Sequence, residues 1–387
     1  MPITLADIAK ALGVSKMTVS RAINNDPKIK AETRERVMEV VRQMNYRPNQ
    51  NARALATNRS YLLALVVPDL MHSYYAEIAK AIESVARPAG YEILLCNTDE
   101  NAAKEVAEVA ALRHRTDGLI IASAVAASNV RVYREMIEEG ARIVLLDRHF
   151  ERMSCPSVIT DNVRVGLMAT EHLISLGHRR IGHLRGPDVR VADDRLEGYQ
   201  QALANHKIRC EDSWVRNCGF LETEGYAAMR VWLAEGDVPS AIFAGNDPAA
   251  IGAIHAIFEA GLRVPEDIAI VGAGKIHYGD LLRVPLTTVG WDVTKMGQQA
   301  ARLLIEAITS PLNKTKSDGL QTFPPDHHAA PTHCATAVRR AEVTNQQLAT
   351  NFHELTRMVF VTALPSNFSN WKRLSAERVT SIIRVNS

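Results

Sequence analysis

Two short stretches near the start of the chain repeat apolar residues at the spacing of an amphipathic helix. Gly13 lies between them and supplies the backbone freedom that a tight turn needs. A third stretch, 31–44, shows the same periodicity. The three apolar faces comprise Leu5, Ile8, Ala9 and Leu12; then Val19, Ala22 and Ile23; then Val37, Val40, Val41 and Met44. The pattern predicts three short helices that close one small core.

The predicted helix ends carry suitable capping residues. Thr4 and Asp7 fit a capping box for the first helix, and Ser15 is a good N-cap for the second. Pro48 breaks the third. Two helices joined by a tight turn are typical of the helix-turn-helix, whose second helix enters the DNA major groove.

The outward face of the second helix suits DNA. Lys16 and Arg21 can donate to guanine, and Met17 offers apolar contact to a thymine methyl. Short polar side chains are expected to hold phosphates: Thr4, Ser15, Thr18, Ser20 and Asn24. The alternative is a small helical bundle with a solvated basic face.

A short helix over about 50–56 is predicted next, with Asn49 as its cap and Arg53 among its expected DNA contacts. So short a helix is marginal alone, so we expect it to fold against a partner. Leu55 is apolar with little core to join. It either wedges into a minor-groove step or packs on the helical head.

Charge is distributed unevenly along the 387 residues. Residues 1–59 hold 11 Lys and Arg against 5 Asp and Glu, whereas the whole chain is only +2. A basic head on a mildly acidic body favours polyanion binding by the head, with chance clustering as the alternative.

From residue 61 onward, short apolar runs alternate with helical patterns. This alternation predicts two α/β lobes built on parallel sheets, with ligands bound at the carboxyl ends of the strands. The expected strands are 62–67, 92–96, 118–122, 143–146, 181–184, 241–244 and 268–271. The expected helices are 75–87, 102–114, 130–139, 164–176, 194–205, 223–234, 247–260 and 295–307.

The sequence does not support several other classes of protein. The five scattered cysteines contain no CxxC pair, which favours reduced thiols in a cytoplasm. No signal peptide and no apolar run of membrane-spanning length is present, so we expect a cytoplasmic protein without a membrane partner. No GxSxG elbow, Walker loop or HExxH occurs, so neither an enzyme nor a cofactor is expected.

The head resembles the LacI/GalR family of bacterial transcription regulators. The matching strings are TLADIAKALGVSKMTVSRAIN, TRERVMEVVRQMNYRPN and NARALAT. The resemblance implies that Lys16, Met17 and Arg21 read bases, and that Leu55 wedges between base pairs from a hinge helix ordered by DNA.

The body resembles the periplasmic-binding-protein-like effector domain of that family. The matching strings include LLDR at 145–148, HLISLGH at 172–178, RLEGY at 195–199 and GND at 245–247. The resemblance implies effector contacts from Tyr74, Tyr75, Asp147, Arg195, Phe220 and Asn246. Taken singly, Asp147 and Asp247 can equally be caps at strand ends.

One position departs from the family pattern. Gly274 takes the place of an acidic residue that contacts sugar hydroxyls in the family, and Lys275 follows it. We therefore expect Lys275, or His277, to meet the carboxylate or phosphate of a sugar acid or sugar phosphate. A plain surface lysine is the alternative.

The resemblance stops after Pro311. The segment 323–334 contains Asp326, His327, His328, His333 and Cys334, whose spacing matches no zinc pattern, so no metal site is expected. The tail is interpreted as disordered, or as a reading-frame change or foreign end. On that interpretation the last strand of the effector fold needs another source.

Together these features predict a helix-turn-helix domain (1–46), a hinge helix and linker (47–60), a two-lobed effector and dimerisation domain (61–310) and an unmatched tail (311–387). The predicted function is a ligand-responsive, sequence-specific transcription regulator, a repressor of carbohydrate or sugar-acid genes. Its partners are double-stranded operator DNA, a small effector (sugar, sugar acid or sugar phosphate) and a second copy in a homodimer. The alternative is a sugar-binding module without DNA regulation.

Overall fold

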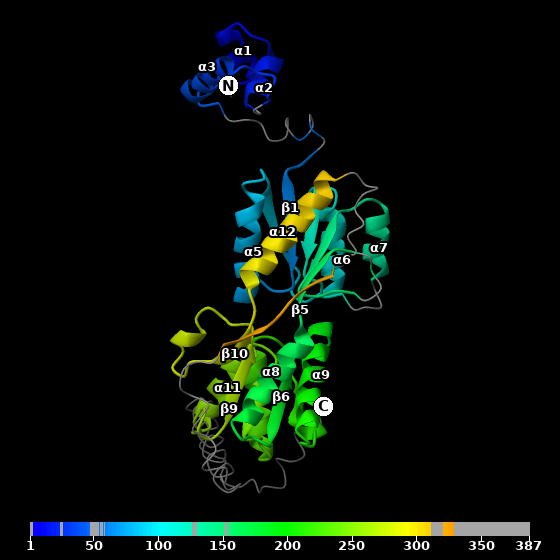
Figure 1. Ribbon diagram of the computed structural model, residues 1–387, viewed down its shortest axis with the longest axis vertical. Coiled ribbons are helices and arrows are strands. Elements are labelled where there is room, and N and C mark those ends of the chain that lie inside the picture. Colours follow the sequence, from blue (N-terminus) through cyan, green and yellow to red (C-terminus); the bar gives the residue numbers. More distant parts are fainter. Residues whose placement is uncertain are drawn as a thin grey trace, which may run out of the picture.

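The computed structural model places a helical head above a two-lobed α/β body (Figure 1). It describes residues 3–23, 26–46, 54, 57, 59–125, 130–150, 153, 155–310 and 320–328. The predicted architecture, an all-α head and parallel sheets in the body, is confirmed.

The head consists of helices α1 (Leu5–Leu12), α2 (Lys16–Ile23) and α3 (Ala31–Gln43). Gly13 ends α1 in a left-handed conformation with φ 66°, as its place in the turn requires. The Ser15 side chain accepts the Thr18 N–H at 3.1 Å and so caps α2. The predicted apolar faces meet in one core, of which Ile8, Val19 and Ala22 are the most buried.

The segment that joins head and body is described only in part. Ala54 and Thr57 are helical, in and next to the predicted hinge helix. Asn24, Asn49, Arg53 and Leu55 lie outside the described residues, so their predicted DNA contacts stay predictions. Just beyond the hinge, Asp117 accepts hydrogen bonds from the Ser60 N–H at 2.7 Å and the Tyr61 N–H at 3.0 Å. The body therefore holds the chain where it leaves the hinge.

The lobe nearer the head, here called the N-lobe, is a parallel sheet in the order β11-β5-β4-β3-β1-β2. Helices α5 and α12 pack together on one face, where Gly297 lets the two backbones approach. The strands are β1 (Leu62–Val67), β2 (Glu92–Asn97), β3 (Gly118–Ile121), β4 (Ile143–Leu146), β5 (Ser157–Thr160) and β11 (Leu320–Phe323). The helices are α5 (Ser73–Ala86), α6 (Ala102–Leu112), α7 (Arg131–Glu138) and α12 (Val293–Thr309).

The second lobe, here called the C-lobe, has the strand order β12-β10-β9-β8-β6-β7, with β12 antiparallel to β10. Helices α8 and α9 pack as one pair and α10 and α11 as another. The strands are β6 (Ile181–Arg185), β7 (Val215–Asn217), β8 (Ala241–Ala244), β9 (Ala269–Ala273), β10 (Thr287–Gly290) and β12 (Asp326–His328). The helices are α8 (Asn162–Ser175), α9 (Arg190–Asn205), α10 (Glu222–Glu235) and α11 (Asp247–Glu259).

The chain passes between the lobes after β5, after β10 and after β11. The third crossing corrects the prediction that the α/β body ends at 310. Strand β11 pairs with β5 of the N-lobe, and β12 pairs with β10 of the C-lobe. Leu320–Phe323 thus supplies the strand that was expected to need another source. Its four residues reach strand structure because the exposed edge of β5 offers backbone partners, which a local pattern does not reveal. Residues 329–387 lie outside the described part.

Five strands, β5, β7, β10, β11 and β12, were not predicted. Each is only three or four residues long, and each contains polar residues. Ser157 and Thr160 in β5 and Thr287 and Thr288 in β10 are buried. Burial on both faces of a parallel sheet removes the alternation that marks an exposed strand.

Candidate DNA interface and effector cavity

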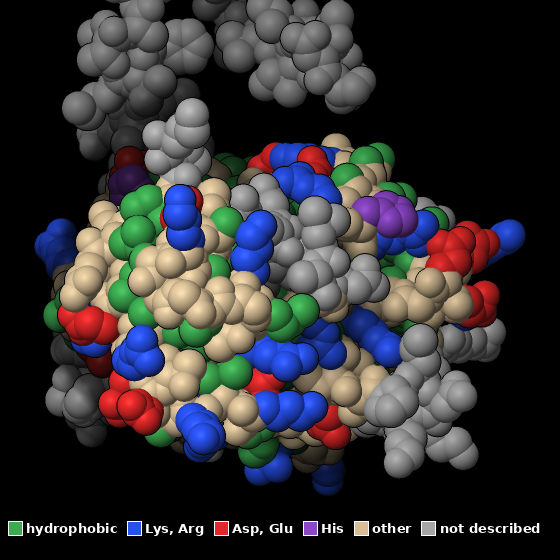
Figure 2. Space-filling view, turned by 90° about the horizontal axis from the view of Figure 1, so that it is seen from above, with side chains coloured by type: hydrophobic (Ala, Val, Ile, Leu, Met, Phe, Trp, Pro, Cys, Tyr) green, Lys and Arg blue, Asp and Glu red, His purple; other side chains and the backbone are tan. Residues whose placement is uncertain are grey.

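Helix α2 presents its predicted reading residues to solvent. Met17 is 61% exposed although it is large and apolar, and the side chain of Arg21 is 48% exposed. Lys16 is also exposed, while Val19 and Ala22 face the core. Seen from the head end, Lys and Arg side chains are spread over the surface (Figure 2). The geometry leaves one face of α2 free to enter a groove.

Two acidic side chains near this face have local partners. Asp7 accepts hydrogen bonds from the Thr4 N–H at 2.8 Å and the Thr4 hydroxyl at 2.7 Å, and these bonds lower the pKa of Asp7. Asp26 lies 3.6 Å from Arg21. Such an exposed pair is weak and can exchange for a contact to a base or phosphate.

A cavity of about 400 Å³ lies between the two lobes, within the size range of small-molecule sites. It forms at the carboxyl ends of the strands, where parallel sheets bind ligands. Its walls come from both lobes and from the crossing after β10. They comprise Asp69, His72, Tyr74, Tyr75, Asp99, Glu100, Asp147, Arg148, Pro187, Val191, Arg195, Gly219, Phe220, Leu221, Glu224, Asn246, Ala273, Gly274 and Trp291.

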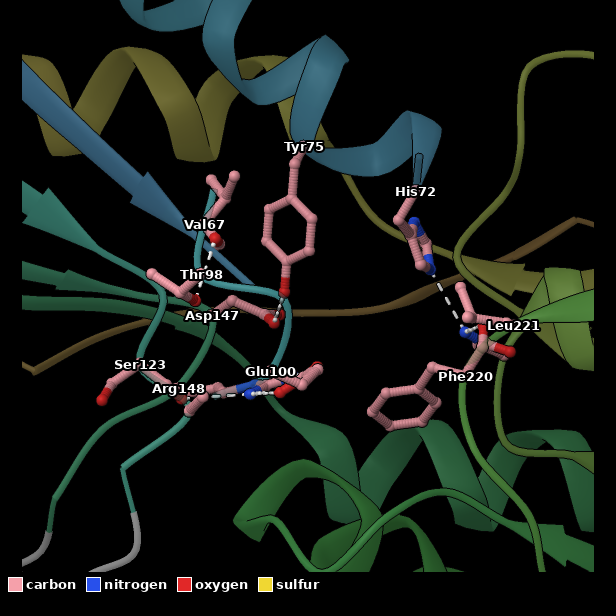
Figure 3. Close-up of polar contacts among 12 residues, drawn as sticks. Val67, His72, Tyr75, Thr98, Glu100, Ser123, Asp147, Arg148, Phe220 and Leu221 are labelled. Carbon is pink, nitrogen blue, oxygen red and sulfur yellow. Dashed lines mark hydrogen bonds and ion pairs between the residues drawn. The ribbon is translucent and has the colours of Figure 1, made fainter. Parts of the chain in front are cut away.

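Asp147 is the acidic centre of the N-lobe wall. Its carboxylate accepts the Tyr74 hydroxyl at 3.2 Å and the Tyr75 hydroxyl at 3.3 Å, as Figure 3 shows for Tyr75. Burial and the nearby Asp147 carboxylate raise the pKa of both tyrosines well above 10.0, so both stay donors. Within the described part of the chain, Asp147 forms no ion pair.

The backbone at Asp147 is held in a turn that few residues adopt. Its φ is 64°, and the Arg148 N–H bonds to the Leu146 carbonyl at 2.6 Å across it. The Arg148 side chain anchors this turn through Glu100, at 2.9 and 2.7 Å, and through the Ser123 carbonyl at 3.1 Å. The turn places the Asp147 carboxylate in the wall of the cavity.

Arg195 is the basic centre of the C-lobe wall. It is 4% exposed, and it donates to Asn162 at 3.0 Å and to the Gly245 carbonyl at 2.6 Å. Its guanidinium lies 5.3 Å from the centre of the Trp291 ring. Among the described residues no carboxylate pairs with it, and burial lowers its pKa. A buried cation and a buried carboxylate thus line the same cavity without pairing.

Asn246 and Phe220 complete the C-lobe wall. Asn246 caps helix α11 by accepting the Ala249 N–H at 2.9 Å, and its amide donates to the Phe220 carbonyl at 2.8 Å. The Phe220 ring packs on Gly186, where any side chain would overlap it. The structure therefore gathers Tyr74, Tyr75, Asp147, Arg195, Phe220 and Asn246 at one cavity, as the resemblance implied.

Lys275 does not line this cavity, which corrects the prediction for it. Gly274 at φ 133° and Lys275 at φ 57° turn the chain so that the Lys275 stem packs over Gly290. Lys275 and His277 instead line a neighbouring cavity of about 410 Å³. The acidic group near Gly274 is Asp247, buried beneath it and bonded to the Thr288 hydroxyl at 2.6 Å and the Ile276 N–H at 2.7 Å.

Sequence reasoning missed several cavity residues, most notably His72, Arg148 and Trp291. Arg148 directly follows Asp147, so the strand end that pointed to Asp147 also signalled it. Trp291 lies in the second crossing segment, directly after the unpredicted strand β10. His72 precedes a predicted helix and has no local signature of a ligand contact.

Comparison with known proteins identifies relatives for both parts of the chain. The model for bacterial regulatory proteins of the lacI family matches residues 4–49, and that for the periplasmic binding protein-like domain matches residues 170–324. The HTH-type transcriptional regulator DegA of Bacillus subtilis is 35% identical over 306 residues, which are 78% of this chain and 90% of DegA.

Two solved structures extend the likeness. The lac repressor dimer bound to operator and the anti-inducer ONPF superposes with a TM-score of 0.76 at 29% identity, covering 87% of this chain and 100% of that one. A transcriptional regulator from Enterococcus faecium with bound ribose gives a TM-score of 0.62 at 26% identity, covering 72% and 100%. Among the described residues, no helix is long and apolar enough to cross a membrane.

Proposed function

This chain belongs to the LacI family of bacterial regulatory proteins, and from that premise we propose that α2 reads an operator under the control of a small polyhydroxylated effector held between the lobes. The chain is a sequence-specific DNA-binding transcription regulator with an effector-binding body. The proposal concerns which residues read, which class of molecule binds and how the two events are linked.

The reading residues are Lys16, Met17 and Arg21. All three are exposed on α2, the helix that follows the turn, and the opposite face of α2 packs into the core of the head. Arg21 suits a bidentate bond to guanine, and Met17 suits a thymine methyl. The short side chains Thr4, Ser15, Thr18 and Ser20 are assigned to phosphates, which fix position without reading sequence.

The effector class follows from the unpaired charges in the cavity. A neutral polyol offers hydroxyls that donate to Asp147 and accept from Arg195, so one molecule satisfies both groups. Tyr74, Phe220 and Trp291 supply the apolar faces on which a sugar ring packs. The Enterococcus relative with bound ribose supports this class, whereas the placement of Lys275 removes the support for an acidic group on the effector.

The link to DNA runs through the start of the body. The Asp117 carboxylate accepts hydrogen bonds from the backbone of Ser60 and Tyr61 directly after the hinge. A movement of the N-lobe therefore moves the hinge. Allostery of this kind is a coupling free energy between two sites, commonly about 1–3 kcal/mol. The proposed role involves no catalysis and belongs in the cytoplasm, where the operator is.

The DNA half of the proposal is tested on an operator selected from random DNA by the wild-type protein. We expect Arg21→Ala to weaken binding by about 1–3 kcal/mol and to relax preference at one base pair. Arg36→Ala, on the exposed side of α3, is the control and leaves base preference unchanged. Unchanged preference in Arg21→Ala would remove Arg21 from the readers.

The effector half is tested by calorimetry with D-ribose, other aldoses and polyols, aldonic acids and sugar phosphates. We expect neutral sugars to bind and to change operator affinity, with each compound recovered unaltered. Tighter binding of the phosphates or acids than of neutral sugars would contradict the proposed class, and chemical conversion of any compound would contradict the absence of catalysis.

A further inference from the structure

One hydrogen bond crosses the cavity directly from lobe to lobe. His72 stands at the N-terminus of α5 in the N-lobe, and Asn246 stands at the N-terminus of α11 in the C-lobe. The His72 Nε2 lies 3.1 Å from the Asn246 Nδ2. Figure 3 shows the imidazole pointing from α5 toward the Phe220–Leu221 segment of the C-lobe.

The helix cap fixes which atom donates. The Asn246 Oδ1 accepts the Ala249 N–H at 2.9 Å, so the amide nitrogen must face the other way. That nitrogen gives one proton to the Phe220 carbonyl at 2.8 Å and the other to His72. His72 Nε2 is therefore the acceptor, the ring is neutral, and its own proton is on Nδ1.

This assignment leaves Asn246 with no proton to offer an effector. Of its two donor bonds, the one to Phe220 stays within the C-lobe and is shorter, so the bond to His72 is the one to exchange. The His72 Nδ1 is buried and has no hydrogen-bond partner among the described residues. A buried donor without a partner weakens the arrangement and makes it easier to release.

We infer that His72 is a latch between the lobes, which holds the cleft closed by occupying the Asn246 amide and which an effector must displace in order to bind Asn246. The inference rests on the proposed function, in which Asn246 is a contact of the effector. His72 also contacts the rings of Tyr74 and Tyr75 edge-on, at 6.0 and 5.8 Å between centres. Its release therefore also moves the tyrosines that hold Asp147.

Protonation of His72 opens the latch, because a protonated Nε2 and the Asn246 amide are both donors. Burial lowers the pKa of His72 below 6.5, although the carboxylates of Asp147, Glu222 and Asp69 favour the charged ring, and Arg195 adds to the lowering. Asp247, next to Asn246, also titrates on acidification, because burial raises its pKa to about 6. A variant without the imidazole separates the two groups.

The test measures the distance between the lobes without any added small molecule. Spin labels are attached through unnatural amino acids at two exposed positions, Ala107 of α6 and Gln201 of α9. Pulsed electron paramagnetic resonance then measures the distance between the labels. At pH 8 we expect one short distance in the wild type. In His72→Phe we expect the ratio of molecules with the long distance to molecules with the short distance to rise about fivefold, which is the effect of losing one ordinary hydrogen bond. His72→Gln keeps an acceptor and is expected to restore the short distance.

Two controls separate the latch from general loosening. His206→Phe makes the same change at an exposed position outside the cavity and is expected to match the wild type. Lowering the pH is expected to move the wild type toward the distances that His72→Phe shows at pH 8. Distances in His72→Phe that match the wild type at pH 8 overturn the latch. Further opening of His72→Phe on acidification measures groups other than His72, among them Asp247 and the contact of His277 Nδ1 with Glu77 Oε1 at 3.3 Å, which also joins the lobes.

The wild-type protein gives an answer even if the variants do not fold. Nitrogen-15 spectra are expected to show the His72 proton on Nδ1, and a proton on Nε2 overturns the inference. For D-ribose we expect about fivefold tighter binding to His72→Phe than to the wild type or His72→Gln. Equal affinities overturn the competition. Ribose that binds none of these proteins removes ribose as the effector, and the distance measurements then decide the latch.

Discussion

Asp147 is the carboxylate to which we assign the main effector contact. Its carboxylate is aimed at the cavity by a turn with positive φ, and two tyrosine hydroxyls bond to it. The strain of that turn is supported by the Arg148 anchor. Behind the anchor, Ser123 and Tyr133 donate to the buried Glu105. The turn that holds Asp147 is thus supported by a buried polar network.

Asp147→Asn is expected to weaken binding of the sugar that the wild type binds by about 10- to 100-fold, because a charged acceptor is lost. Calorimetry measures the change. Asp99→Asn is the matched control, since Asp99 lines the same cavity but is bonded to Lys104 at 2.6 Å. Equal losses of sugar affinity in the two variants would show that the negative charge of the cavity matters and that Asp147 makes no direct contact with the sugar.

Asp247 carries a pH dependence of stability. Burial raises its pKa from 3.8 to about 6, although Thr288 and Ile276 donate hydrogen bonds to it. Since the pKa of Asp247 is higher in the folded than in the unfolded protein, protonated Asp247 adds to the stability of the fold. This contribution is complete below pH 3.8 and is lost as the pH rises through 6. Its full size is about 3 kcal/mol of unfolding free energy.

We therefore expect the free energy of unfolding of the wild type to fall by about 2 kcal/mol more than that of Asp247→Asn between pH 4 and pH 7. Urea titrations followed by tryptophan fluorescence measure both proteins. Parallel pH profiles would mean that Asp247 keeps its ordinary pKa in the folded protein.

At the scale of elements, the crossing of α8 and α9 positions the basic wall. A Cβ at Gly166 would lie 2.1 Å from the Arg195 carbonyl, and one at Gly198 would lie 1.9 Å from the Val163 carbonyl. Only glycines allow this approach. It sets the distance between Asn162 at the start of α8 and Arg195 on α9, which are bonded to each other.

Gly198→Ala is expected to destabilise the protein by about 1–3 kcal/mol, because the new methyl group forces the two helices apart. Thermal unfolding measures the loss, and sugar binding is expected to weaken with it. Gln201→Ala, on the exposed side of α9, is expected to stay within about 0.5 kcal/mol of the wild type. A stable Gly198→Ala would show that the crossing tolerates separation.

At the scale of the whole molecule, the family binds operator DNA as dimers, and the related lac repressor structure is a dimer on its operator. Leu281 of this chain is 85% exposed, far more than a leucine in a core. It lies in the C-lobe segment that follows β9. We expect this side chain to be covered by the second copy, since large exposed apolar groups mark interfaces.

Leu281→Lys is expected to shift the protein from dimer to monomer in sedimentation velocity and to lower operator affinity at the same time. Gln201→Lys adds the same charge on α9 and is expected to remain dimeric. A dimeric Leu281→Lys protein would place the interface elsewhere on the body.

The sequence by itself determined most helices and the central strands, including the helix proposed to read DNA. Helical periodicity located α1 to α3 because each of them buries one face. Continuous apolar runs located the central strands because both of their faces are buried, and the caps Gly13 and Ser15 act within a few residues. The resemblance then identified six of the cavity residues. All of these signals are local, or are carried by short strings that keep their order along the chain.

Only the tertiary structure decided how distant segments meet. It set Asp147 and Arg195 into the walls of one cavity, joined His72 to Asn246, turned Lys275 onto Gly290 and drew Leu320–Phe323 into the N-lobe sheet. Each of these contacts joins residues that are far apart in sequence or depends on a backbone turn. Packing of the two lobes selects them, and no local pattern records that choice.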